Sequence, residues 1–262
     1  MVVNEAKGSN SGEICEIDFA VLLEDAKRGD AEAQNKVGKC YHDGVGVEVN
    51  KEEAFKWYMK AAEQGLAVAQ FNVGDCYDLG DGVDRSYSKA FKWYMKAAEQ
   101  GHVDAQFDIA SCYTCGDGVD RDYAEACKWY MKAAEQGHVR SMYNLAVAYE
   151  SGNGVKESQE EAFKWYLKAA EQGNVKSQYN VAVSYETGIG VKKSLEKAFK
   201  WYRKAADNGN ILALSSAVEC YQEIWDDKKN KDEDVEWYWK AVSQLIWYRD
   251  NLDINMEEMS DI

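Results

Sequence analysis

The residue types and spacings that could support chemistry begin with two thiols, Cys112-x-x-Cys115. Two cysteines at this spacing form half of a tetrahedral zinc site. Cys127 and His138 follow downstream, but the second Cys-x-x-Cys pair that such a site normally uses does not occur in the sequence. We therefore predict no metal ligands here.

Ser86-x-x-Lys89 and Ser194-x-x-Lys197 have the spacing of the serine nucleophile and lysine in penicillin-recognising enzymes. The other signatures of those enzymes, Ser-Asp-Asn and Lys-Thr-Gly, are missing from the sequence. His102 and His138 occupy the same position of a repeat, which favours a helix-capping or surface role, and a lone His42 cannot complete a triad. The sequence predicts no catalytic residues and no cofactor.

Carboxylates gather at two predicted turns, where oxygen ligands for calcium would have to lie. The clusters are Asp78, Asp81 and Asp84, and Asp117, Asp120 and Asp122. Neither cluster has the spacing of an EF-hand loop, and no glutamate closes either one. A solvated acidic edge is the simpler interpretation.

These residues are positioned by an internal repeat of 36 residues. The Trp-Tyr pair recurs at that spacing, at Trp57-Tyr58, Trp93-Tyr94, Trp129-Tyr130, Trp165-Tyr166, Trp201-Tyr202 and Trp237-Tyr238. Glycine recurs in register at Gly29, Gly65, Gly101, Gly137, Gly173 and Gly209, and Gly-x-Gly-Val begins at Gly44, Gly80, Gly116, Gly152 and Gly188. Two turns per period predict two helices per period, and therefore an all-α protein.

The second helix of each period is well signalled at its start. Its first position holds a preferred N-cap residue in every copy: Asn50, Ser86, Asp122, Ser158, Ser194 and Asn230. Three residues later, four of the six copies have glutamate (Glu53, Glu125, Glu161 and Glu233), which predicts a capping box. Six lysines one turn before the end form a ladder that we expect to be exposed: Lys60, Lys96, Lys132, Lys168, Lys204 and Lys240.

The first helix, roughly Asp30 to Asp43 in the first copy, carries its apolar residues on one arc. Gly38 and Gly74 lie on that arc, and Ala110, Ala146 and Ala182 replace them later, so we predict a close approach of two helices there. Cysteine shares one buried position at Cys40, Cys76, Cys112 and Cys220, where we expect small core residues rather than reactive thiols.

The repeat divides the chain into a solenoid over 14–245 between a flexible segment, 1–13, and an acidic tail or cap, 246–262. The six predicted units are 30–65, 66–101, 102–137, 138–173, 174–209 and 210–245, preceded by a half-unit at 14–29 that caps the N-terminal end. In the tail, Ile246, Trp247, Leu252 and Met256 could pack as a capping turn.

Charge excludes some classes of partner. The sequence has 31 basic and 46 acidic residues, a net charge of −15, which has the wrong sign for binding phosphates. No apolar stretch approaches the roughly 20 residues of a membrane helix. The N-terminus lacks the features of a signal peptide, and seven cysteines do not suggest a disulfide framework. We expect a cytoplasmic protein that binds no nucleic acid and does not insert into membranes.

The repeated motif resembles the Sel-1-like repeat, a relative of the tetratricopeptide repeat. The motif is Gly-x-x-x-Ala-Gln, then Tyr-x-x-Gly-x-Gly-Val, then Ala-x-x-Trp-Tyr-x-Lys-Ala-Ala-x-x-Gly, and Ala69 to Gly101 matches nearly every position. The resemblance covers about 14–245 and implies a right-handed α-solenoid that acts as a scaffold for protein complexes. Many members have proline after Gly-x-Gly-Val, where this chain has Glu48 and its equivalents, so we expect a looser connection. The disulfide-stapled, penicillin-binding branch is not supported, because its cysteine positions are Ala62 and Ala69 here.

First helices usually line the concave face in stacked pairs of this kind, and a helical wheel places positions 35, 39 and 42, with their equivalents, outside the buried arc. We call these positions the first-helix surface. The candidate binding residues are Asn35, Lys39 and His42; Phe71, Asp75 and Asp78; Phe107, Ser111 and Thr114; Tyr143, Val147 and Glu150; Tyr179, Val183 and Glu186; and Ser215, Glu219 and Gln222. Aromatics in a row beside acidic and small residues suit a peptide with apolar anchors and basic flanks. Alternatively, Phe71, Phe107, Tyr143 and Tyr179 fill gaps between neighbouring first helices.

The leading hypothesis is a non-enzymatic scaffold or adaptor that binds a protein or peptide along the concave face. The alternative is a regulatory or substrate-recruiting subunit of an enzyme complex, of the kinase or the ubiquitin-ligase type. The sequence leaves the oligomeric state and the partner's identity open.

Overall fold

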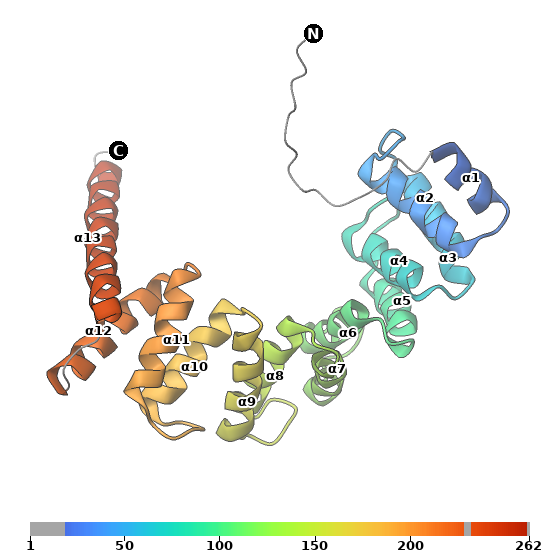
Figure 1. Ribbon diagram of the computed structural model, residues 1–262. Coiled ribbons are helices and arrows are strands. Elements are labelled where there is room, and N and C mark those ends of the chain that lie inside the picture. The colour runs from blue at the N-terminus through green and yellow to red at the C-terminus, as the bar shows by residue number, and fades with distance from the viewer. Residues whose placement is uncertain (1–18, 228–231, 261–262) are drawn as a thin grey trace, which may run out of the picture. The chain divides into compact units, whose positions relative to one another are not determined.

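The computed structural model describes residues 19–227 and 232–260, and every regular element in these ranges is an α-helix (Figure 1). The helices are α1 (Phe19–Lys27), α2 (Ala31–Asp43), α3 (Lys51–Glu63), α4 (Ala67–Leu79), α5 (Tyr87–Glu99), α6 (Val103–Cys115), α7 (Tyr123–Glu135), α8 (Val139–Ser151), α9 (Gln159–Glu171), α10 (Val175–Thr187), α11 (Leu195–Asp207), α12 (Ile211–Asp227) and α13 (Asp232–Ser260). Successive helices pair as the sequence predicts, so the all-α solenoid is confirmed. None of the described helices is long and apolar enough to span a membrane.

The chain forms two compact units. The first is Met1–Ala105 with Asp117–Val119, and the second is Gln106–Gly116 with Asp120–Ile262. In the first unit each helix from α1 to α5 packs against the next, and in the second the same holds from α7 to α13. The cores consist mainly of alanines and of the repeated tyrosines and tryptophans, such as Ala61, Ala97, Tyr94 and Tyr202.

The predicted N-caps are present at most of the second helices. Asn50 and Asp122 accept backbone N–H bonds from Glu53 and Glu125 at 3.0 Å, and Ser158 and Ser194 cap in the same way. Ser86 makes no side-chain cap bond to its helix, and Asn230 lies outside the described residues.

The predicted capping box is wrong in its reciprocal half. The backbone N–H of each cap donates instead to a tyrosine carbonyl of the preceding helix, as Asn50 does to Tyr41 at 2.8 Å and Ser86 to Tyr77 at 2.8 Å. Glu53 is therefore free to pair with Lys56, at 2.6 Å. The same backbone bond fixes the connection before α3, so the predicted looseness without proline is not seen in this turn.

Two kinds of glycine confirm the close approach and the turns. A Cβ atom at Gly38 or Gly74 would lie 2.6 or 2.4 Å from the ring of Tyr58 or Tyr94, which explains the need for a small residue. Gly82, with φ +71°, would bring a Cβ atom within 2.1 Å of the Lys51 carbonyl oxygen. The second glycine of the turn therefore serves both a left-handed conformation and close packing on the preceding repeat.

A ladder of amides joins successive second helices to first helices. Gln64, Gln100 and Gln136 donate to Gln34, Gln70 and Gln106 at 2.7 to 2.8 Å. Gln34 and Gln70 are buried, and each also donates to an alanine carbonyl, which satisfies the buried amides.

The lysine ladder is exposed as expected, and each lysine lies over the tryptophan three residues before it. The distances from Nζ to the ring centroid are 3.9 Å at Lys60, 3.8 Å at Lys96, 3.7 Å at Lys132, 3.8 Å at Lys168 and 4.9 Å at Lys204. Lysine and tryptophan at this separation form cation–π pairs. The conserved spacing of Trp and Lys therefore has a structural role on the second helices.

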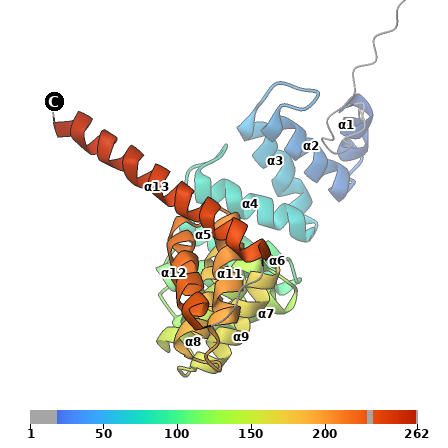
Figure 2. The same ribbon diagram turned by 60° about the vertical axis from the view of Figure 1, so that its left-hand side comes forward.

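The C-terminal end differs from the prediction. α13 is one continuous helix to Ser260 (Figure 2), so no break or capping turn separates 246–262 from the preceding residues. Its first half packs through Trp237, Tyr238 and Ala241 on α12. The unit 210–245 therefore has its two helices, but the second one continues beyond the repeat. The segment 1–13 lies outside the described residues.

Candidate functional site

The residues that suggested chemistry have structural roles. No group of histidine, cysteine and carboxylate side chains in the described ranges is arranged to hold a metal ion. His102 and His138 are helix caps, whose Nδ1 atoms accept backbone N–H bonds from Ala105 and Ser141. Ser194 caps a helix as well.

Burial suppresses the reactivity of the thiols at the repeated cysteine position. Burial raises the pKa of Cys76 to about 12, and the carboxylates of Asp75 and Asp81 reinforce the shift. Burial likewise raises the pKa of Cys220 to about 12. Since the thiolate is the nucleophile, both groups are unreactive at neutral pH.

The predicted first-helix surface contains both open and covered positions. Lys39, Val147, Glu150, Glu219 and Gln222 are exposed, and Phe107 is buried. The others are half-buried: Asn35, His42, Phe71, Asp75, Asp78, Ser111, Thr114, Tyr143, Tyr179, Val183, Glu186 and Ser215. The surface is therefore built of shallow positions, several of which are occupied by contacts within the protein.

The row of aromatics packs against the tyrosine of its own repeat. Ring centroids lie 5.7 Å apart for Phe71 and Tyr94, and 5.8 Å apart for Phe107 and Tyr130. Tyr143–Tyr166 and Tyr179–Tyr202 repeat the contact at 5.8 and 5.5 Å. Phe71 also stacks on His102, at 4.6 Å, and Arg140 lies 4.3 Å from the ring of Phe107. These contacts favour the gap-filling alternative for this row, most clearly at the buried Phe107.

The repeated tyrosine also turns its hydroxyl toward the first-helix surface. Tyr94 donates to Asp75 at 2.7 Å. Tyr166 donates to Glu150 at 2.7 Å, and Tyr202 donates to Glu186 at 2.6 Å. Three predicted binding residues are thus acceptors for tyrosine hydroxyls, an interaction that the sequence analysis missed. The signal was available, because each acceptor lies 16 or 19 residues before its tyrosine.

In the first unit, α2 and α4 enclose a cleft of about 420 Å³. Asn35, Lys39, His42 and Asp75 of the predicted surface line it. The sequence analysis missed further lining residues: Asp43, Tyr58, Val68, Asn72, Cys76, Leu79 and Asp81. Asn72 donates to Asn35 at 2.8 Å and so joins the two helices across the cleft.

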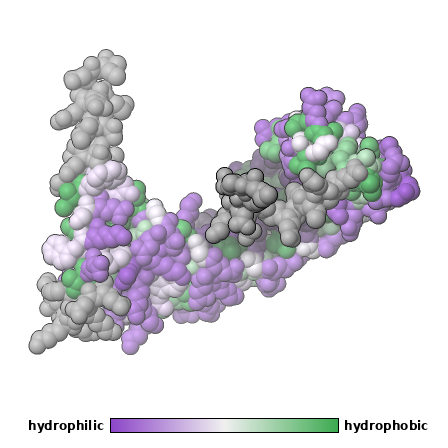
Figure 3. Space-filling view, turned by 45° about the horizontal axis from the view of Figure 1, so that its top comes forward, coloured by the Kyte–Doolittle hydropathy of each residue, from purple (hydrophilic) through white to green (hydrophobic). Residues whose placement is uncertain are grey.

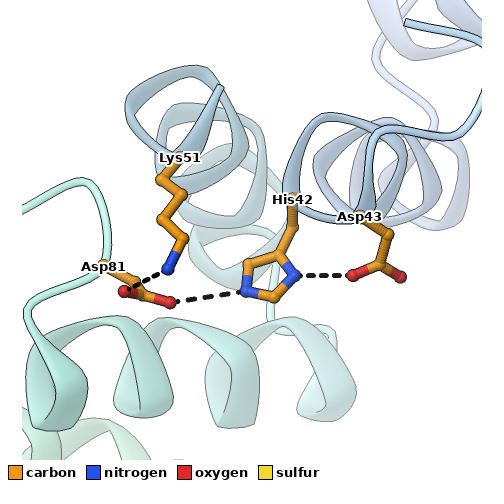
Figure 4. A network of polar contacts seen from close by, with 4 residues as sticks. All are labelled: His42, Asp43, Lys51 and Asp81. Atoms are coloured by element: carbon orange, nitrogen blue, oxygen red, sulfur yellow. Dashed lines mark hydrogen bonds and ion pairs between the residues drawn. The ribbon is translucent and has the colours of Figure 1, made fainter. Parts of the chain in front are cut away.

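A polar network borders this cleft (Figure 4). His42 lies between two carboxylates, with Nδ1 2.6 Å from Asp43 and Nε2 3.5 Å from Asp81. Lys51, the first residue of α3, contacts Asp81 at 2.7 Å. The hydrogen bond from Lys51 is the main reason why the pKa of Asp81 is lowered. The network ties the end of α2 and the start of α3 to the turn after α4.

The rest of the surface is largely polar. Hydrophilic residues cover most of the face seen in Figure 3, as 46 acidic and 31 basic residues lead one to expect. Leu79, at the edge of the cleft, is an exception with 65% of its surface exposed, and Val68 is 39% exposed. An apolar rim beside buried acid is the main chemical feature of the cleft.

Comparison with known proteins places these features in a wider group. The family profile described as Sel1 repeat matches residues 31–66, 67–102, 103–138, 139–174 and 175–210. It does not extend over 14–30 or over the predicted sixth unit, 210–245, which remains a prediction. No curated protein sequence gives a significant match.

Two crystal structures are similar to this chain in both sequence and fold. One is c5321, a protective antigen present in uropathogenic Escherichia coli strains and displaying an SLR fold; it is 36% identical, with a TM-score of 0.78 over 86% of this chain and 49% of that one. This chain therefore spans about half the length of that antigen. The other is a Sel1 repeat protein from Oxalobacter formigenes, 34% identical with a TM-score of 0.67, covering 86% of this chain and 96% of that one.

Proposed function

Because this chain belongs to the Sel1 repeat family, whose repeats generally mediate protein–protein interactions, we propose that it is a non-enzymatic scaffold that binds a protein or peptide along its first-helix surface. The observation that supports this proposal is the cleft between α2 and α4, where predicted surface residues converge around a buried carboxylate. The unreactive thiols and the capping roles of His102 and His138 agree with a binding rather than a catalytic role.

The side chains that remain available on this surface suit a partner with basic and apolar groups. Asp75 and Asp78 lie on α4, and Val147 on α8 is exposed. Buried or half-buried carboxylates next to apolar side chains provide both charge complementarity and desolvated contact area. The net charge of −15 steers basic partners toward the chain at low salt.

A surface variant tests the proposal without touching the packed aromatics. Asp78→Arg with Val147→Arg changes the net charge by +3 on the first helices. Glu63→Arg with Glu171→Gln makes the same change on the second helices, at exposed positions. Partners captured by the wild-type chain and identified by mass spectrometry are then purified and titrated against all three proteins.

We expect the first-helix variant to lose at least about tenfold in affinity, as the loss of one central contact does, while the control keeps its affinity and both remain helical by circular dichroism. Equal binding by both variants would move the site away from the first-helix surface. Saturable turnover by the highly purified chain would contradict the non-enzymatic part of the proposal.

A further inference from the structure

The cleft between α2 and α4 contains a tyrosine that differs from its equivalents in the other repeats. Tyr58 is only 5% exposed and lines the cleft. Its hydroxyl makes no hydrogen bond within residues 19–227 and 232–260. Burial raises the pKa of Tyr58, so the hydroxyl stays neutral and can both donate and accept.

In the five later repeats the equivalent hydroxyl has a partner. Tyr94, Tyr166 and Tyr202 donate to carboxylates at 2.6 to 2.7 Å. Tyr130 lies 3.5 Å from the hydroxyls of Ser111 and Thr114, and Gln222 donates to Tyr238 at 2.9 Å. The partner always lies 16 or 19 residues before the tyrosine.

The first repeat has lost this partner through two substitutions at the same positions. They are occupied by Lys39 and His42. The ring of His42 is held by Asp43 and Asp81, and Lys39 is exposed. The hydroxyl of Tyr58 is therefore left facing the cleft.

The charges around the cleft are also unbalanced. Asp81 is paired with Lys51, and Asp43 contacts His42. Asp75 accepts a hydrogen bond from the neutral Tyr94 and has no ion pair within the described residues. Burial raises the pKa of Asp75 to about 6, and the nearby Asp78 and Asp104 carboxylates reinforce this, so the group is ionised at neutral pH without a cation beside it. A buried carboxylate of this kind is stabilised by a cationic ligand.

We propose that this cleft binds an arginine side chain of a partner protein, with the guanidinium between Asp75 and the Tyr58 hydroxyl and the aliphatic stem against Val68 and Leu79. A guanidinium fits because it presents several N–H donors in one plane to a carboxylate and a neutral oxygen together, which a single ammonium does less well. The apolar rim covers the methylene groups of such a side chain. The proposal rests on the proposed function, because it identifies one contact of the partner on the first-helix surface.

Lys39 provides a test of the sign of the ligand's charge. It lines the same cleft and is exposed, so it repels a cationic ligand and attracts an anionic one. Lys39→Gln should therefore tighten the binding of arginine, whereas for a carboxylate or phosphate ligand it should weaken binding.

The probe is the blocked peptide acetyl-Gly-Arg-Gly-amide, titrated into the full-length chain and followed by backbone amide NMR shifts of α2 and α4. A single side chain gives weak binding, so we expect saturation in the millimolar range. The same peptide with citrulline in place of arginine keeps the shape and removes the charge, and acetyl-Gly-Lys-Gly-amide keeps the charge without the planar fork.

Three variants define the expected pattern for the arginine peptide. Asp75→Asn should weaken binding about tenfold or more, since it removes a charge-assisted hydrogen bond. Tyr58→Phe should weaken binding a few-fold, and Lys39→Gln should strengthen it by about a factor of two or more. Glu186→Gln, the carboxylate of the fifth repeat that already holds its tyrosine, is the matched control and should leave the affinity unchanged.

Absence of saturable shifts with the arginine peptide, equal binding of the citrulline peptide, or weaker binding by Lys39→Gln would each overturn the proposal. Equal affinity for the lysine peptide would overturn the choice of arginine. If the arginine peptide fails to bind while Asp78→Arg with Val147→Arg still abolishes capture of partners, the proposed function stands and only the arginine site is rejected.

Discussion

The first two repeats and the later repeats share one helix-pair design but differ at the positions that face the repeated tyrosine. In the fourth and fifth repeats, Glu150 and Glu186 hold the hydroxyls of Tyr166 and Tyr202. In the first repeat, the side chains at these positions are Lys39 and His42, and the hydroxyl of Tyr58 faces a cleft instead. A repeat can therefore gain a candidate site by losing an internal hydrogen bond, without a change in its backbone.

The packing of the tyrosine ring differs between the same two regions. Gly38 and Gly74 leave the rings of Tyr58 and Tyr94 so close to the first helix that a Cβ atom would lie 2.6 or 2.4 Å away. Ala110, Ala146 and Ala182 occupy this position later in the chain and are fully buried. The early repeats have thus exchanged a methyl group for closer contact with the ring, next to the cleft.

The largest effect is expected from the turn that borders the cleft. Gly82→Ala should reduce the free energy of unfolding by more than about 2 kcal/mol, because the new Cβ atom would overlap the Lys51 carbonyl in a backbone with φ +71°. Gly65→Ala is the matched control. Its φ is +92°, but nothing lies within 4 Å of the new atom, so we expect a loss of only about 1 kcal/mol. Urea denaturation followed by circular dichroism measures both, and equal losses would show that the contact with Lys51 is unimportant.

The close approach of the ring gives the next effect. Gly74→Val should destabilise the chain by about 1–3 kcal/mol, because overpacking displaces the Tyr94 ring that holds Asp75. Ala146→Gly, at the same position in a later repeat, should lose only about 1 kcal/mol through helix propensity. The two variants are compared by their denaturation midpoints. An unchanged midpoint for Gly74→Val would contradict the packing difference between the two regions.

The sequence predicts the helix pairs because their signals are local. N-caps such as Asn50 and Asp122 are short polar residues before an apolar pattern, and Gly65 and its equivalents supply the positive φ that ends a helix. A period of 36 residues then repeats each local signal, which removes the ambiguity of any single one. The Sel1 resemblance and the fold follow from the same positions.

The parts that the sequence did not predict depend on contacts between elements. The glutamate of the expected capping box has no free N–H to bind, since the Tyr41 carbonyl already accepts that of Asn50. The second reason for glycine at Gly82 is a carbonyl in the preceding repeat. The role of Tyr58 depends on which side chains its hydroxyl reaches, and a helical wheel shows only that the residue is apolar enough to be buried. Comparing positions 39 and 42 across the repeats would have revealed it.

Removing single hydroxyls tests the main difference directly. Tyr202→Phe should destabilise the chain by about 1 kcal/mol, because it deletes a hydrogen bond to the Glu186 carboxylate and leaves that group without its donor. Tyr58→Phe deletes a hydroxyl that has no partner in the described part of the chain, so the free energy of unfolding should stay within about 0.5 kcal/mol of the wild type. Thermal and urea denaturation of both variants provide the comparison. An equal loss at the two positions would mean that Tyr58 has an internal partner as well.

The smallest effect concerns the pH dependence of stability. The pKa of Asp75 is raised by burial to about 6, above its ordinary value of 3.8, with Asp78 and Asp104 acting in the same direction and Tyr94 and His42 against it. Between about pH 4 and 6 the folded chain thus keeps a proton that the unfolded chain has released, so this group's contribution to stability falls as the pH rises through that window. Asp75→Asn removes this dependence.

At pH 7 we expect Asp75→Asn to be more stable than the wild type by up to about 1 kcal/mol, a value kept small because the side chain is partly exposed. Urea midpoints measured from pH 4 to pH 8 should show a shallower slope for the variant below pH 6. Tyr94→Phe should act in the opposite sense, since it removes the hydrogen bond that lowers the pKa of Asp75, and should move the window to higher pH. Parallel profiles for Asp75→Asn and the wild type would mean that Asp75 is not the strained carboxylate that a bound cation would relieve. The early repeats would then differ from the later ones in hydrogen bonding alone.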